Sequence, residues 1–91
     1  MTKQLEIIIN GKLEGKLEVE EIKKDEIKFI KLELPTEIKS KLHMGMFNEG
    51  AKYIFPIKEY IETIQHGMEH YLEKEVKIIE YQTSPSYSQK I

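Results

Sequence analysis

Two histidines one helical turn apart, His66 and His70, offer the most specific chemistry that this sequence could perform. Imidazoles at that spacing on a helix can reach one metal ion, and Glu62 or Glu73 could supply a carboxylate oxygen as a further ligand. The zinc-protease motif needs a glutamate directly after its first histidine, and Gly67 occupies that position instead. A solvated helix face with adventitious affinity for zinc or nickel therefore explains these side chains better than a functional site. We predict weak metal binding and no cofactor.

The rest of the chain offers no nucleophile with neighbours that would activate it. There is no cysteine, no Gly-x-Ser-x-Gly motif and no glycine-rich phosphate loop. His43 lies beside Met44 and Met46 in an expected strand, a position that favours a sheet edge or the core over catalysis. The sequence therefore predicts a protein that is not an enzyme.

Composition limits the partners and the compartment. The net charge is −2, and all fourteen positively charged residues are lysine. Arginine is the residue that reads guanine and grips phosphate with two parallel hydrogen bonds, so its absence argues against nucleic-acid binding. The longest uninterrupted apolar run is Ile7 to Ile9, too short to span a membrane or to resemble a signal peptide. With no cysteine to suggest an oxidising compartment, we expect a cytoplasmic protein without a membrane partner.

The helix that must position the two histidines is predicted from Pro56 to Lys74. At about 100° per residue its large apolar side chains share one arc of roughly 120°, which favours a single buried stripe. Pro56 suits the first helical position, where its missing N–H costs nothing. Gly67 lies on the flank of the stripe. Either another backbone approaches the helix closely there, or the glycine is a genetic accident without a structural role. The stripe consists of Ile57, Tyr60, Ile61, Ile64, Met68, Tyr71 and Leu72.

The first hairpin contains Asn10-Gly11, the strongest short signal for a two-residue turn. A two-residue loop pairs Ile9 with Lys12, Ile7 with Glu14 and Leu5 with Lys16, which places three aliphatic residues on the same face as three charged ones. A three-residue loop from Asn10 to Lys12, or an equivalent bulge, keeps every large apolar residue except Ile8 on one face, so burial favours it. The expected pairs are Ile9 with Leu13, Ile7 with Gly15, Leu5 with Leu17 and Lys3 with Val19.

Charge pairing predicts the register of the next hairpin. The second strand should end near Ile22 and the third should run from Ile27 to Leu34, with a four-residue loop at 23–26. Opposite charges then face each other at three positions, which selects a register more than it stabilises the fold. The expected pairs are Glu21 with Lys28, Glu18 with Lys31, Lys16 with Glu33, Val19 with Ile30 and Leu17 with Leu32.

The same register leaves three large apolar residues, Ile22, Ile27 and Phe29, on the outer, charged face at the hairpin tip. We predict a partner-binding patch there, with Lys23 and Lys24 in its charged rim. The alternative is that other parts of the monomer cover the tip.

The remaining segments complete an α+β domain. Pro35 should end the third strand, and 36–40 could form one helical turn capped by Thr36. Segments 42–47 and 51–55 should form a second hairpin around a turn at 48–50, and 76–81 should form a last strand with Ile78 and Ile79 on opposite faces. Residues 82–91 have the composition of a loop.

The expected fold is a single domain over residues 1–81, an antiparallel sheet of two hairpins and a last strand with one long helix on one face. The leading expectation for function is a binding module that docks on another protein or on a second copy of itself. An adaptor, an assembly subunit or an inhibitor fits this class, and such proteins are common among genes of phages and mobile elements. A small-ligand or metal-binding protein that uses the histidines or a helix–sheet cavity is the first alternative. A lysine-driven RNA binder is the second.

Overall fold

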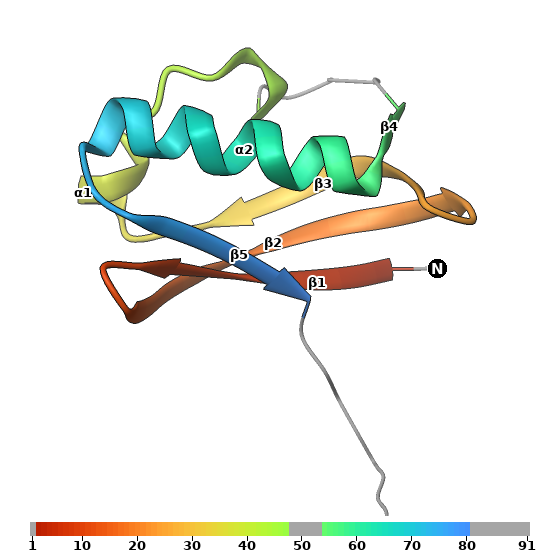
Figure 1. The fold of residues 1–91 in the computed structure, drawn as a ribbon, viewed down its shortest axis with the longest axis horizontal. Coiled ribbons are helices and arrows are strands. Elements are labelled where there is room, and N and C mark those ends of the chain that lie inside the picture. Colours follow the sequence, from red (N-terminus) through yellow and green to blue (C-terminus); the bar gives the residue numbers. More distant parts are fainter. Residues whose placement is uncertain (1, 48–53, 81–91) are drawn as a thin grey trace, which may run out of the picture.

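The computed structural model describes residues 2–47 and 54–80. An antiparallel, curled five-stranded sheet carries one long helix across one of its faces (Figure 1). The strand order β4-β3-β2-β1-β5 places the C-terminal strand beside the N-terminal one. The predicted α+β architecture is therefore confirmed. Along the chain the elements are β1 (Thr2–Ile9), β2 (Lys12–Lys23), β3 (Glu26–Glu33), α1 (Thr36–Lys39), the 3-10 helix η1 (Gly45–Phe47), β4 (Ile54–Pro56), α2 (Ile57–Leu72) and β5 (Val76–Glu80).

The apolar stripe of α2 packs against the inner face of the sheet. Ile57, Tyr60, Ile64 and Met68 are buried, whereas Tyr71 is 38 % exposed. These side chains meet an inner face whose buried residues come from four strands, because alternate residues of a strand point to the same side. The strand side of the core consists of Leu5, Ile7, Ile9, Leu17, Val19, Ile27, Leu32, Val76 and Ile78.

The helix is slightly shorter than its periodicity predicts. Pro56 has extended dihedral angles (φ −60°, ψ 135°) and caps α2 as the last residue of β4, so the helix begins at Ile57, one residue later than expected. The helix ends where Glu73 adopts a left-handed conformation (φ 55°) and its N–H donates to the carbonyl of Glu69. This residue therefore serves the role that glycine commonly has at a helix end.

The turn between β1 and β2 combines the two alternatives that the sequence allows. Asn10 and Gly11 both have positive φ (50° and 79°), as a two-residue type I′ turn requires. Ile9 therefore pairs with Lys12, and the predicted pairing of Ile9 with Leu13 is wrong. A shift next to Ile7 then inserts one extra residue into β2, the equivalent bulge that burial favoured. From there on the predicted pairs are present: Ile7 with Gly15, Leu5 with Leu17 and Lys3 with Val19.

The β2–β3 hairpin follows the predicted register only in its first half. Lys16 pairs with Glu33, Leu17 with Leu32 and Glu18 with Lys31, as predicted. A bulge beyond Glu18 then sets Val19 opposite Phe29, and a second one near the tip sets Lys23 opposite Glu26. The turn is thus shorter than expected, with Asp25 at a positive φ of 64°. Each one-residue slip exchanges the faces, so the predicted pairs of Glu21 with Lys28 and Val19 with Ile30 are wrong.

The segment after β3 differs from the predicted second hairpin. Residues 42–44 form no strand, and Gly45–Phe47 is a 3-10 helix that packs near β3. The turn predicted at 48–50 lies outside the described residues. Ile54 pairs with Lys28, so β4 extends the sheet from β3. The predicted helical turn exists as α1, but its cap is Pro35 rather than Thr36, without a side-chain hydrogen bond.

Two further expectations concern α2 and β5. A Cβ atom added at Gly67 would lie 3.1 Å from the sulfur of Met44 and closer still to its terminal methyl group, so a side chain, not a backbone, approaches this glycine. On β5 the predicted alternation is confirmed, because Ile78 is buried and Ile79 is 44 % exposed.

None of the described helices combines the length and the apolar character needed to cross a membrane.

Candidate functional site

The helix histidines lie on the solvent side of α2. His66 and His70 are both exposed, and so are Glu62 and Glu73. The ring of His70 packs edge-on against Tyr71, with 5.1 Å between ring centroids. Among residues 2–47 and 54–80, no three histidine, aspartate or glutamate side chains gather closely enough to hold one metal ion. The structure therefore leaves these four residues on a solvated face.

The hairpin tip does not carry the predicted patch. Ile27 is fully buried, and Phe29 is half-buried against the core. Only Ile22 is exposed, at 42 % of its surface. The bulges in the β2–β3 ladder rotate Ile27 and Phe29 to the inner face, so the prediction that the three residues share an outer face is wrong. Lys23 and Lys24 are exposed at the turn, but the apolar patch whose rim they were predicted to form is not there.

No described element covers the opposite face of the sheet (Figure 1). Its charged side chains follow the strand pairing, in which lysine and glutamate face each other at successive positions. Lysines and glutamates are mixed along the three central strands of this face, and neither charge forms a continuous patch there. The lysines are Lys16, Lys28, Lys31 and Lys77, and the glutamates are Glu6, Glu18, Glu20 and Glu33.

One ion pair on this face joins Lys31 and Glu33, two residues apart on β3. The ammonium of Lys31 lies 2.9 Å from a carboxylate oxygen of Glu33, and both side chains are more than half exposed. Their hydrogen bond and mutual attraction raise the pKa of Lys31 and lower the pKa of Glu33. Because both side chains are so exposed, the pair fixes the positions of the two charges on the surface but adds little to the stability of the fold.

Three apolar side chains gather on the outer face near the β1–β2 turn. Ile8 pairs with Leu13 on one side and with Lys77 on the other, and Ile79 lies diagonally across from it on β5. Leu13 is 53 % exposed and Ile79 is 44 % exposed. We call Ile8, Leu13 and Ile79 the outer apolar cluster. Three other exposed isoleucines, Ile22, Ile30 and Ile54, lie apart from it on β2, β3 and β4, toward the β2–β3 turn.

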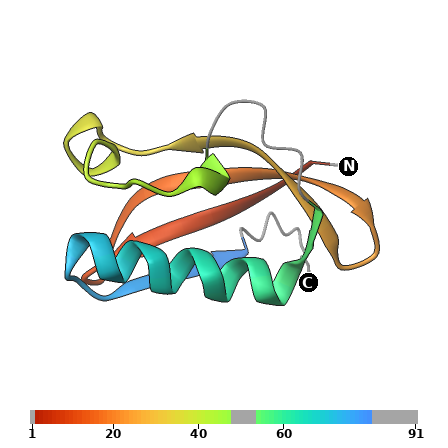
Figure 2. The ribbon, with the colours of Figure 1, turned by 90° about the horizontal axis from the view of Figure 1, so that it is seen from above.

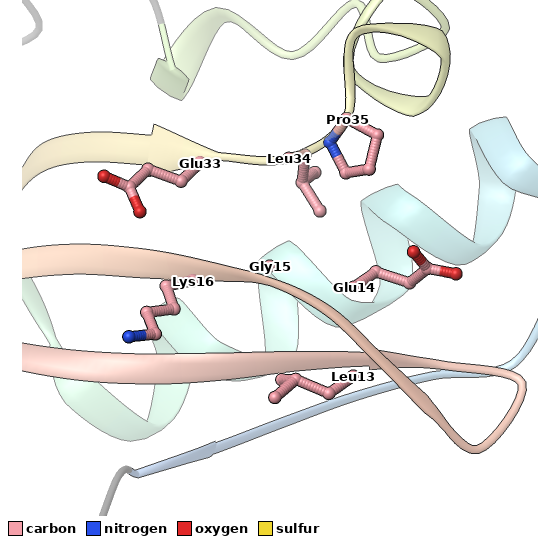
Figure 3. Close-up of a pocket in the computed structure, with 7 residues that line it drawn as sticks. All are labelled: Leu13, Glu14, Gly15, Lys16, Glu33, Leu34 and Pro35. Carbon is pink, nitrogen blue, oxygen red and sulfur yellow. The ribbon is translucent and has the colours of Figure 1, made fainter.

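A cleft continues this cluster toward β3 (Figure 3). Beyond the last β2–β3 pair the strands diverge, and Leu34 points into the gap between them while Pro35 closes its far end. The opening has a volume of about 470 Å³. A second cleft, of about 390 Å³, lies between β3, α1 and the segment around His43. Neither is lined by a residue of α2, the helix that carries the candidate metal ligands. The first is lined by Leu13, Glu14, Gly15, Lys16, Glu33, Leu34 and Pro35.

Sequence reasoning missed the outer apolar cluster for a specific reason. It placed Leu13 opposite Ile9, on the inner face, and left Ile8 as the one apolar residue that did not fit. The Asn10-Gly11 turn signal, followed literally to its first two pairs, would have set Ile8 opposite Leu13.

The fold and the uncovered face define a small two-layer α+β domain, one helix over one side of an antiparallel sheet. Comparison with known proteins extends this description no further, because no family model, no curated protein and no solved structure matches the chain.

Proposed function

We propose that this protein is a non-enzymatic binding module that docks on another protein through the outer face of its sheet. The observation that carries the proposal is the outer apolar cluster, three aliphatic side chains on a face that no described element covers. A few apolar anchors within a polar surround supply most of the affinity in protein interfaces. The adjoining cleft beside Leu34 and Pro35 offers a recess for a side chain of the partner.

Charge on this face supports a protein partner over a nucleic acid. A nucleic-acid surface needs an excess of positive charge, because neutralising phosphates supplies most of the affinity. Here Lys16, Lys28 and Lys31 each have a glutamate across from them in the strand pairing, and Lys31 also has Glu33 at 2.9 Å. Alternating charges instead suit a partner whose own charges are mixed, where they fix orientation and exclude wrong partners.

The decisive experiment compares variants in quantitative affinity capture from the cells in which the gene occurs. Leu13→Lys and Ile79→Lys each place a charge in the cluster and should reduce recovery of the partner about tenfold or more. Both positions are already exposed, so we expect their melting temperatures to stay within a few degrees of the wild type. Equal recovery by both variants and the wild type would refute the proposal.

Ile22→Lys is the matched control, because it makes the same change at an exposed isoleucine at the other end of β2. It should retain the partner in full. Repeating the capture at about 0.5 M salt tests the class of partner, because lysine-driven binding to RNA falls steeply with salt and apolar docking does not. If the wild type itself sediments as a dimer that Leu13→Lys dissolves, the partner is a second copy of the chain.

A further inference from the structure

Among the described residues, β5 lies at one edge of the sheet and pairs with a strand on one side only, namely β1. Such an edge normally presents unpaired N–H and C=O groups, which are a template for pairing with another chain. Figure 2 shows α2 running along β5, above this edge of the sheet. The helix is therefore placed to act on the backbone of β5 as well as on its side chains.

Two side chains of α2 accept hydrogen bonds from the free edge of β5. Gln65 Oε1 accepts from the N–H of Ile78 at 2.9 Å, and Glu69 Oε2 accepts from the N–H of Val76 at 3.1 Å. Both N–H groups consequently face away from β1. Because the N–H groups of successive strand residues point to opposite sides, residues two apart point the same way, and the N–H of Glu80 also faces away from β1.

The spacing of helix and strand explains why two contacts fit at once. Four residues along a helix advance about 6 Å, and two residues along a strand advance about 6.6 Å. Gln65 and Glu69 thus match Ile78 and Val76 in antiparallel order. Both of these helix residues are half-buried, in contrast to the exposed His66 on the same helix.

A second tie holds the start of β5 in place. The N–H of Asn10 donates to the carbonyl of Glu75 at 2.9 Å, and Asn10 Oδ1 accepts from the N–H of Glu75 at 3.2 Å. The β1–β2 turn therefore fixes the residue before β5, and α2 occupies the edge of the strand beyond it.

We infer that Gln65 and Glu69 form a lock that prevents β5 from pairing with β5 of a second copy of this chain. A second copy is the occupant that the strand itself favours, because antiparallel pairing about Ile78 sets Lys77 opposite Ile79 and Val76 opposite Glu80. No like charges are opposed in that arrangement. Identical strands related by a twofold axis also close the assembly at a dimer.

Sedimentation velocity of the variant Gln65→Ala/Glu69→Ala tests the lock. Alanine keeps the helix propensity and removes both acceptors, so the variant should remain helical and reach about twice the mass of the wild-type species with rising concentration. Glu62→Ala/His66→Ala likewise replaces two polar side chains, four residues apart but at exposed positions of α2, and should sediment like the wild type. Gln65→Glu keeps an oxygen acceptor and should do so too.

Adding Glu80→Pro separates edge pairing from general loss of stability. Proline removes an N–H from the free edge of β5 and should return the double variant to the wild-type mass. The inference is overturned if the folded double variant sediments like the wild type, or if Glu80→Pro leaves its association unchanged. If the double variant does not fold, Gln65→Ala alone is sedimented with and without Glu80→Pro, and the same two outcomes overturn the inference. These variants leave the outer apolar cluster intact, so the result does not depend on the proposed docking function.

Discussion

The ring of Phe29 lies against the ring of Phe47, with 5.5 Å between their centroids and 52° between their planes. This contact joins β3 to η1, so the irregular segment after α1 covers the end of the core rather than extending the sheet. A tilted aromatic pair of this kind contributes about 0.5–1.5 kcal/mol beyond the area it buries. Phe29 is therefore a structural residue.

Replacing Phe29 with serine should lower the free energy of unfolding by about 2–4 kcal/mol, because it removes both the aromatic contact and apolar burial. Urea denaturation of the purified variant measures the loss. Ile22→Ser is the matched control at an exposed position of the same hairpin and should cost less than about 1 kcal/mol. Equal losses for the two variants would mean that Phe29 does not belong to the core.

The residues that the sequence placed correctly are those whose positions follow from burial alone. The stripe of α2, apart from the exposed Tyr71, and the inward positions of Leu5, Ile7 and Leu17 follow the period of their elements. For the first hairpin, burial predicted that an extra residue was needed, although not that it would sit beyond the turn.

The errors arise where a single inserted residue reverses the faces of a strand. Ile22 and Ile30 are the residues left over at the two irregularities of the β2–β3 ladder, and both are exposed. Neither is a glycine or a proline, so the sequence carries no local marker for a bulge. Charge matching located the register on one side of the bulges and failed beyond them, because exposed charge pairs are too weak to outweigh the burial of Ile27.

Tyr60 carries a hydroxyl that is buried without a hydrogen-bond partner among the described residues. Phenylalanine at this position keeps the ring, which lies 5.4 Å from that of Phe55, and removes the desolvated oxygen. We expect Tyr60→Phe to match or exceed the wild type in stability at neutral pH, by up to about 1 kcal/mol. A clear loss of stability would show that the hydroxyl does have a partner.

The same residue should make stability depend on pH in alkaline solution. Burial raises the pKa of Tyr60 above its ordinary value of 10.0, so the folded protein keeps its proton where the unfolded chain loses it. Its contribution is fully present below about pH 10 and is lost as pH rises above that value. Urea titrations at several alkaline pH values should therefore show the wild type losing up to about 1.4 kcal/mol per pH unit relative to Tyr60→Phe. Parallel pH profiles would contradict the assignment.

Asn10 combines a left-handed backbone with a side-chain bond to the N–H of Glu75. Asn10→Ala should lower the free energy of unfolding by about 1–2 kcal/mol, because alanine is strained at positive φ and lacks the acceptor. Asn10→Gly relieves the strain and loses only the side-chain bond, so it should cost about 1 kcal/mol or less. Thermal and urea unfolding measure both variants, and the reverse order would mean that the conformation of the turn contributes less than the side chain does.

Gly15 and Gly67 differ in what an added Cβ atom would meet, namely backbone at Gly15 and a flexible side chain at Gly67. A Cβ atom at Gly15 would overlap the backbone carbonyl oxygen of Glu33 and lie 2.7 Å from a methyl group of Leu34. A backbone atom in a paired strand cannot move without moving the ladder. A Cβ atom at Gly67 would instead overlap the end of the Met44 side chain, which is flexible and can turn aside.

Gly15→Ala should therefore lower the free energy of unfolding by more than about 2 kcal/mol, since the strands must separate where the cleft opens beside them. Gly67→Ala gains about 1 kcal/mol of helix propensity and loses a similar amount to the displacement of Met44, so its net change should stay within about 1 kcal/mol. Urea denaturation of the two variants measures this difference directly. If Gly15→Ala is as mild as Gly67→Ala, β2 and β3 are not held as closely at Glu33 as the structure places them, and the cleft beside Leu34 would have to be wider.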